Sequence, residues 1–265
     1  MAIINFVILF VAAILGGTLN SVAGGGSFIG FPALIYVNVL PKMANATNTM
    51  ALWPGSVAAA WAFKKELLQQ NKMLLLVLGI TSFIGGVGGA LLLIDTPQTT
   101  FERLIPFLML AATLLFAVSP LVNARLRQRA IARRKEGEVT RISGVALFGI
   151  AILQLIISVY GGYFGGGIGI LMLASLGVMG LENIHEMNAV KNMLAVCING
   201  VAVITFIILG AIVWLDAAIM IVGAIIGGFG GAYYAHKLDP RLVRGFVILV
   251  GCTMTIYFLF KYGFF

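Results

Sequence analysis

The chain has 265 residues, of which 61% are hydrophobic and 10% are charged, and its mean hydropathy is +1.07. A soluble domain of this length needs far less apolar material for one core, so the composition excludes a soluble globular protein and indicates an all-α polytopic membrane protein. The formal net charge of +8 is concentrated in one short stretch, which argues against a nucleic-acid partner and for a loop beside the bilayer.

Five apolar segments fill the first part of the chain, residues 1–122. They lie near 3–23, 27–40, 45–63, 73–94 and 101–120. No charged residue precedes Lys42, so the first segment lacks the positive flank of a cleavable signal peptide and is predicted to be a retained span.

A run of three glycines, Gly24, Gly25 and Gly26, interrupts a stretch from Leu19 to Val37 that carries no charge. Each glycine costs a helix roughly 1 kcal/mol relative to alanine, so the triplet predicts a break. Unwound backbone is tolerated at membrane depth only where protein or a water-filled cavity covers it. The break is therefore expected to face the inside of the protein.

A basic linker, residues 123–142, separates the two parts of the chain. Between Asn123 and Arg141 it holds seven basic and two acidic residues, which supply five of the eight net charges. Basic clusters beside membrane spans lie on the cytoplasmic side. We expect a cytoplasmic linker in a protein of the inner (plasma) membrane.

The remaining part, residues 143–265, repeats the pattern. Its five apolar segments lie near 144–163, 168–181, 188–209, 216–235 and 242–260. Three motifs recur in the same order at an offset of about 142 residues: AGGGSF from Ala23 as FGGGIG from Phe164, NATNTM from Asn45 as NAVKNM from Asn188, and IGGVGGA from Ile84 as IGGFGGA from Ile226. Because five is an odd number of segments, the halves are predicted to be inverted repeats.

The positive-inside rule sets the orientation. With the linker inside, counting spans outward places both termini outside and two further basic loops inside, with Lys64, Lys65, Lys72, Lys237, Arg241 and Arg244. This placement of the basic loops inside requires the short segments 27–40 and 168–181 to cross the membrane.

Glycine breaks at corresponding places in two inverted halves point to the binding site of a transporter. The second triplet is Gly165, Gly166 and Gly167. A helix that restarts at Ser27, or after Gly167, presents free amides and the positive end of its dipole, so two such ends would form an anion site. The alternative is that the glycines only allow close packing. We expect that packing role for two other pairs, Gly85 with Gly89 and Gly227 with Gly231.

Polar residues follow each break on one helix face: Asn45, Thr47, Asn48 and Thr49 in the first half, and Asn188, Lys191 and Asn192 in the second. A polar face among apolar neighbours is expected to look into the protein. Lys191 is the leading candidate for substrate contact, because an ammonium in an apolar segment needs a partner, a cavity or an anion. The alternative is that it reaches the cytoplasmic surface or pairs with Glu182 or Glu186.

Other chemistry has little support. HEMNA from His185 begins like a zinc motif, but Ala189 stands where the second histidine is needed, and neither G-x-S-x-G nor a phosphate-binding loop is present. No enzyme, metal or other cofactor is indicated. Asp95, Glu182 and Glu186 could carry a coupling proton, but all three lie near predicted segment ends, where a solvated loop position is the favoured alternative. A coupling sodium ion is also open.

The motifs NSVAGGGSFIGFPAL from Asn20 with ANATNTM from Ala44, and YGGYFGGGIG from Tyr160 with NAVKNM, resemble those of the TauE/SafE family of sulfite-exporter-like membrane proteins over essentially the whole chain. The resemblance implies an inner-membrane carrier for sulfite, sulfonates or related small organic anions. It also implies site residues at the two glycine triplets and at Asn45, Thr47, Asn48, Lys191 and Asn192. Some relatives have an acidic residue where this chain has neutral Asn20.

The sequence thus predicts a secondary transporter of a small anion, sulfite or an organosulfonate, that exposes a site between inverted halves alternately to two sides. An anion channel could use the same breaks without alternating access. A membrane scaffold or receptor that transports nothing could use its glycines for packing alone. The sequence leaves these alternatives open.

Overall fold

The computed structural model describes residues 2–22, 25–135, 144–179, 181, 183–234 and 240–263. Within these ranges every regular element is a helix, which confirms the predicted all-α fold. The helices are α1 (Ala2–Val22), α2 (Ser27–Tyr36), α3 (Pro41–Ala62), α4 (Lys64–Leu68), α5 (Lys72–Asp95), α6 (Gln98–Lys135), α7 (Gly144–Tyr163), α8 (Ile168–Val178), α9 (Ile184–Ile208), α10 (Trp214–Tyr234) and α11 (Pro240–Lys261). Each predicted apolar segment corresponds to one helix, and the short α4 joins α3 to α5.

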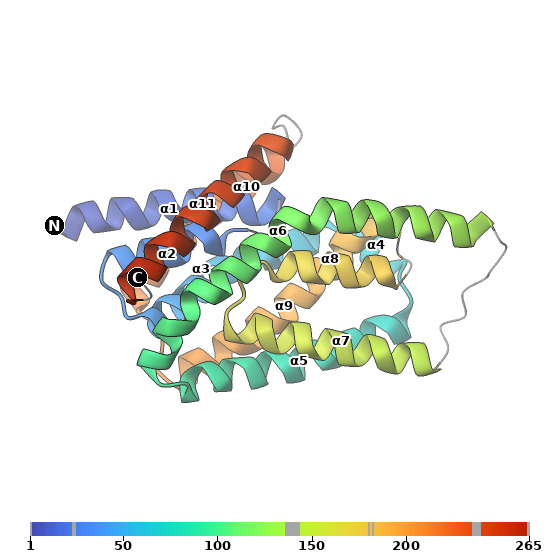
Figure 1. Ribbon diagram of the computed structural model, residues 1–265, viewed down its shortest axis with the longest axis horizontal. Coiled ribbons are helices and arrows are strands. Elements are labelled where there is room, and N and C mark those ends of the chain that lie inside the picture. Colours follow the sequence, from blue (N-terminus) through green and yellow to red (C-terminus); the bar gives the residue numbers. More distant parts are fainter. Residues whose placement is uncertain are drawn as a thin grey trace.

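Two helical hairpins enter the bundle from opposite ends (Figure 1). α1 and α2 pack together and run in opposite directions, as do α7 and α8. The first glycine segment joins α1 to α2, and the second joins α7 to α8. Because α1 and α7 also run in opposite directions, the arrangement agrees with the predicted inversion of the two halves.

Neither short helix is long enough to cross a membrane. α2 has 10 residues and α8 has 11, so at about 1.5 Å per residue they extend roughly 15–17 Å, about half of the ~30 Å hydrocarbon core. The charge count required segments 27–40 and 168–181 to cross, a point that the sequence left open, and helices of this length do not span the hydrocarbon core by themselves. Each short helix returns toward the end from which its hairpin enters, and α3 begins at the end from which the first hairpin enters (Figure 1).

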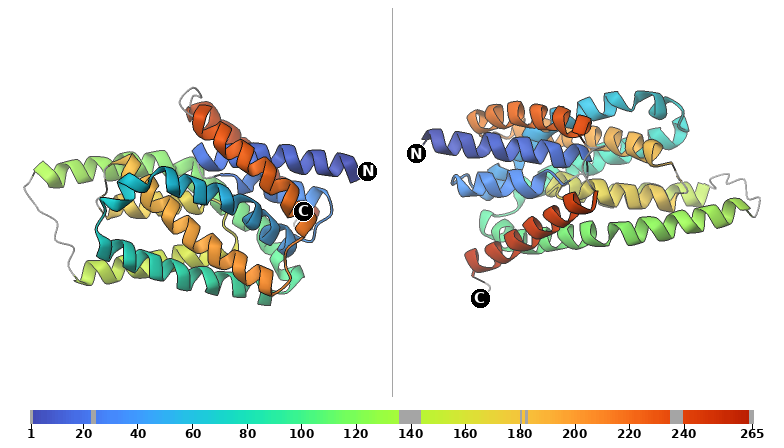
Figure 2. Two further views of the ribbon diagram at one scale, coloured as in Figure 1. Left: turned by 180° about the vertical axis from the view of Figure 1, so that it is seen from behind. Right: turned by 90° about the horizontal axis from the view of Figure 1, so that it is seen from above.

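The two halves exchange helices with each other. α1 packs along α10 and α7 packs along α5, and in the same reciprocal way α3 contacts α10 and α9 contacts α5. The corresponding helices α3 and α9 also contact each other, as do α6 and α11. The views in Figure 2 show this interleaving from two further sides. A pseudo-two-fold relation between the halves produces such a pattern.

Glycines allow the exchanged helices to approach backbone to backbone. A Cβ on Gly85 or Gly89 of α5 would run into the backbone of α7, and one on Gly227 of α10 would run into the backbone of α1. This is the close approach that small residues permit in membranes. The predicted packing role is confirmed for these three glycines, while the surroundings of Gly231 lie outside the described part of the chain.

Several helices match the thickness of a bilayer. Four in the described ranges are long and apolar enough to cross one, over Ile3–Asn20, Lys72–Asp95, Gln98–Val118 and Glu186–Ile208. Large apolar side chains such as Phe83, Phe148 and Phe229 are exposed on the outside of the bundle, where lipid would cover them. α6 has 38 residues and therefore extends roughly 57 Å, well beyond the ~30 Å core. The first part of the basic linker is the end of this helix.

Candidate functional site

The first glycine segment is a close crossing of two backbones. α2 begins at Ser27, directly after Gly26. A Cβ on Gly26 would lie 2.5 Å from the carbonyl oxygen of Gly16 in α1, so the approach of α2 to α1 requires glycine there. Gly25 is buried beside it, and Gly24 lies outside the described residues.

The second glycine segment needs glycine for its backbone conformation. Gly165 and Gly167 both have a φ of +74°, in the left-handed region that costs other residues roughly 1–2 kcal/mol. The hydroxyl of Tyr160 donates a hydrogen bond of 2.7 Å to the carbonyl oxygen of Gly166, which holds the turn between α7 and α8. The two triplets are alike in sequence but use glycine for different physical reasons.

The two breaks meet inside the protein and share a cavity. Phe31 of α2 packs edge to face on Phe164, just after α7, with ring centroids 5.7 Å apart. The cavity, of about 60 Å³, is lined by both hairpins together with α3, α9 and α10. This volume has room for a few water molecules or one small oxyanion. Its polar lining residues are Asn20, Ser27, Thr49, Ser56, Lys191, Asn192 and Asn199.

Lys191 is buried in this lining without a partner. Its side chain is only 8% exposed, and it makes no ion pair or hydrogen bond with any residue that the structure describes. Glu186, one of its expected partners, instead accepts a hydrogen bond from Asn183, and Glu182 lies outside the described ranges. Lys191 is therefore buried rather than exposed on the outside of the protein, and its pairing with Glu182 stays a prediction.

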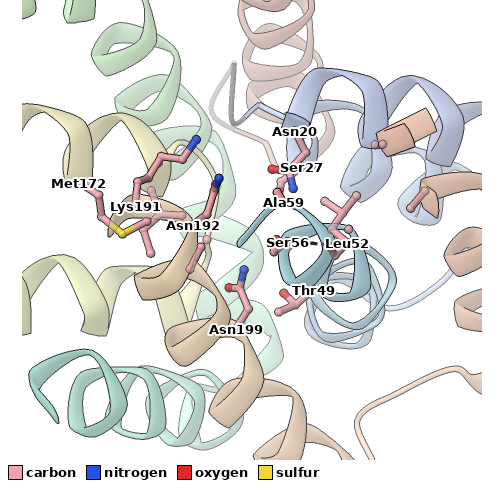
Figure 3. Close-up of a pocket in the computed structure, with 18 residues that line it drawn as sticks. Asn20, Ser27, Thr49, Leu52, Ser56, Ala59, Met172, Lys191, Asn192 and Asn199 are labelled. Carbon is pink, nitrogen blue, oxygen red and sulfur yellow. Dashed lines mark hydrogen bonds between the residues drawn. The ribbon is translucent and has the colours of Figure 1, made fainter. Parts of the chain in front are cut away.

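The polar ends of four side chains gather at one part of the cavity. Figure 3 shows Lys191 and Asn192 of α9 on one side, and Asn20 and Ser27 of the first hairpin across from them. A buried ammonium is costly without a counter-charge. The arrangement is therefore suited to a small anion held between the two halves.

Backbone amides at both helix starts add to the positive character. Ser27 and Gly169 both line the cavity, and their backbone N–H groups make no hydrogen bond with the residues that the structure describes. They belong to the first turns of α2 and α8, where the helix dipole places partial positive charge. Each half thus contributes one amide that has no partner among the described residues.

Much of the polar face of α3 is used for internal hydrogen bonds. The side-chain amide of Asn45 donates 3.0 Å to the carbonyl oxygen of Tyr163 at the end of α7. That of Asn48 donates 3.1 Å to the hydroxyl of Ser27. These two bonds tie α3 to the second hairpin and to the start of α2.

Two threonines of α3 complete this structural role. The hydroxyl of Thr47 accepts a hydrogen bond of 3.0 Å from the backbone N–H of Val213, immediately before α10. The hydroxyl of Thr49 donates 2.9 Å to the carbonyl oxygen of Asn45 in the same helix. Thr49 nevertheless lines the cavity, whereas Thr47 does not.

The structure brings five of the predicted site residues together on the cavity wall: Ser27, Thr49, Gly165, Lys191 and Asn192. Other predicted residues within the described ranges do not line it, namely Gly25, Gly26, Asn45, Thr47, Asn48, Gly166, Gly167 and Asn188.

The sequence interpretation missed two polar residues of the cavity wall and gave Asn20 no site role. Ser56 follows Thr49 by two helical turns, and Asn199 follows Asn192 by the same interval. Residues at this spacing share a helix face. Extending each polar face by two turns would therefore have found both.

These features define the class of the protein. It is a helical membrane protein in which two oppositely directed hairpins, both broken at glycine, surround a buried polar cavity, an architecture typical of membrane transporters. Among the described residues, no three or more His, Cys, Asp or Glu side chains gather into a metal-binding cluster.

The model of the sulfite exporter TauE/SafE family matches residues 9–258, and the chain therefore belongs to the TauE/SafE family. It is similar to a probable membrane transporter protein of Haemophilus influenzae, with 27% identity over 259 residues that cover 97% of this chain and 96% of the relative. It is equally similar to the probable membrane transporter protein YfcA of Escherichia coli K12, with 27% identity covering 96% of this chain and 89% of the relative. The probable membrane transporter protein YunE of Bacillus subtilis is 24% identical, covering 94% of this chain and 97% of the relative.

No solved structure matches the chain. The family and the relatives confirm the resemblance and the class: this is a membrane transport protein.

Proposed function

We propose that this protein is a secondary transporter of a small sulfur oxyanion, sulfite or an organosulfonate, in the inner (plasma) membrane with residues 123–142 on the cytoplasmic side. The observation that carries the proposal is the buried ammonium of Lys191, which has no partner in the described chain and lines a cavity shared by both glycine breaks. An anion is the ligand that such a group lacks. The family's description as sulfite exporters supports a sulfur oxyanion.

The anion would exchange its hydration shell for groups of the cavity wall. Lys191 offers three N–H donors and the positive charge, and the side-chain amide of Asn192 offers two more donors. The hydroxyl of Ser27 accepts its hydrogen bond from Asn48, so its own hydrogen is left for a ligand. With the free amides of Ser27 and Gly169, these donors suit the several oxygens of a sulfite or sulfonate group.

Alternating access follows from the position of the cavity between two inverted halves. Movement of one half against the other around a fixed midplane site is the general mechanism of transporters with this symmetry. The lining also contains Leu52, Ile168 and Met172, and these apolar side chains interrupt the polar wall. A confined site of this kind supports a carrier rather than a continuous polar pore.

Counterflow of labelled sulfite in proteoliposomes tests the proposal. We expect unlabelled sulfite inside the vesicles to accelerate uptake of the label, because a carrier exchanges its ligand, and we expect Lys191→Ala to abolish this exchange. Lys65→Ala, at an exposed position of α4, is the matched control and should keep wild-type exchange. A flux that shows no trans-stimulation would point to a channel, and equal small losses in the two variants would remove Lys191 from the site.

The same vesicles identify the coupling ion. A proton gradient or a sodium gradient is imposed across the membrane, one at a time, with equal sulfite on both sides. Accumulation of the label against its own gradient under only one of these conditions identifies the coupled ion.

A further inference from the structure

The cavity offers one positive side chain among several neutral polar ones. Within the described part of the chain, Lys191 is the only lining residue that carries a charge. The polar groups that gather around it, Asn20, Ser27 and Asn192, are all neutral (Figure 3). Neutral donors orient an anion and stabilise it partly, but they do not cancel its charge.

The duplicated half does not supply a second cation. The residue of the first half that corresponds to Lys191 is Asn48, at the same offset that relates Asn45 to Asn188. Asn48 is neutral, and its side-chain amide donates to the hydroxyl of Ser27. The two-fold relation of the helices is therefore not matched by a two-fold relation of the charges.

Two other lysines near the ends of α3 have partners away from the cavity. The ammonium of Lys42 donates to the carbonyl oxygens of Ile94 and Thr96, at 2.6 and 2.7 Å. That of Lys64 lies over the ring of Trp61, 4.4 Å from its centroid. Neither is free to add a charge to the site.

We infer that the site takes an oxyanion with a single negative charge, such as an organosulfonate or hydrogensulfite, and discriminates against dianions such as sulfate. The inference rests on the proposed function and specifies the charge of its substrate. One ammonium balances one negative charge. The partial positive charges of the two helix starts stabilise a second negative charge less than an ammonium would, so a dianion remains the costlier ligand in an interior of low dielectric constant.

Methanesulfonate and sulfate form a matched pair of probes, because on the same tetrahedral sulfur a methyl group in one replaces a charged oxygen in the other. The affinity of the purified full-length protein for each is measured by thermal stabilisation in gluconate salts, so that no other small anion competes. We expect methanesulfonate to bind at least about tenfold more tightly than sulfate. Equal affinities, or tighter binding of sulfate, would overturn the inference and leave the proposed function intact. Stabilisation by none of methanesulfonate, sulfate and sulfite would contradict the proposed function, and the inference with it.

Asn20→Lys provides a second test, because it adds an ammonium across the cavity from Lys191. We expect the ratio of sulfate to methanesulfonate affinity to rise by about tenfold or more in this variant. An unchanged ratio in a folded variant that still binds methanesulfonate would contradict the inference. Lys65→Ala is the control and should keep the wild-type ratio. Should two ammonium groups in one cavity prevent folding, the comparison of the two probes on the wild-type protein decides the inference by itself.

Discussion

The polar faces of α3 and α9 correspond in sequence but differ in what they do. On α3, the side chains of Asn45 and Asn48 donate to groups of the two hairpins. On α9, Lys191 and Asn192 are buried in the cavity wall, and no described residue bonds to Lys191. One copy of a duplicated motif can therefore hold the hairpins in place while the other copy remains available to a ligand.

The comparison predicts two kinds of variant. Changes at Asn45, Thr47 and Asn48 of α3 should lower the stability of the protein, while changes at Lys191 and Asn192 of α9 should lower its affinity for the anion. A variant that shows the opposite behaviour would break the distinction.

The largest effect is expected for Asn48→Lys, which gives the α3 face the charge of the α9 face. Asn48 is 1% exposed and its side-chain oxygen Oδ1 lies against Gly30, so a longer charged side chain has no space and no counter-charge. We expect a loss of more than about 3 kcal/mol of folding stability, measured by thermal unfolding in detergent. The control is Gln69→Lys, at an exposed site after α4. A fully stable Asn48→Lys protein would show that this face is not committed to packing.

The reciprocal change, Lys191→Asn, gives the α9 face the residue of the α3 face. We expect it to cost about 2–5 kcal/mol of anion-binding free energy, because the one charge of the cavity is lost. Thermal stability without ligand should stay the same or increase, since an uncompensated buried ammonium has been removed. Titration with methanesulfonate measures the affinity. Unchanged affinity would mean that the anion does not contact Lys191.

A smaller loss of affinity is expected for Asn192→Ala. This change removes two neutral donors, and a hydrogen bond to a charged group contributes about 1.5–3 kcal/mol. The stability of the ligand-free protein should change little, and the same titration provides the measurement. Asn188→Ala, on the same helix but away from the cavity, should leave the affinity at the wild-type value.

The smallest effect is expected for Thr47→Val on the α3 face. The substitution keeps the shape and removes the oxygen that accepts from the N–H of Val213 before α10. Losing an acceptor at a helix start costs about 1 kcal/mol, so the unfolding temperature should fall slightly while the affinity for methanesulfonate is retained. An affinity change larger than the stability change would place Thr47 in the binding site.

Hydropathy was sufficient to predict where the helices lie, because apolar runs separated by polar or basic stretches mark them directly. The segment 73–94 corresponds to α5, Lys72–Asp95. Hydropathy did not predict where α2 ends. Val37, Val39 and Leu40 are apolar, but the chain turns at Asn38 with a φ of +67°. A turn set by backbone geometry within an apolar run leaves no mark in hydropathy, and the predicted segment 27–40 therefore extends beyond the end of α2 at Tyr36.

The candidate site was predictable only in part. Lys191 and Asn192 could be found because polar residues in an apolar segment need a reason to be there. Asn48 bonds to Ser27, while the equivalent residue Lys191 lines the cavity. This difference depends on how closely the neighbouring helices approach α3 and α9. Residue spacing within a single helix contains no information on that distance.

We propose above that an anion lies between the two glycine breaks against Lys191. Crystals of the protein soaked with selenite, in which selenium replaces the sulfur of sulfite, test it by anomalous scattering. We expect a selenium peak in the cavity with an oxygen within hydrogen-bonding distance of the Lys191 ammonium, facing Ser27 and Asn192. A peak elsewhere, or an empty cavity in crystals of a protein that transports selenite, would contradict it.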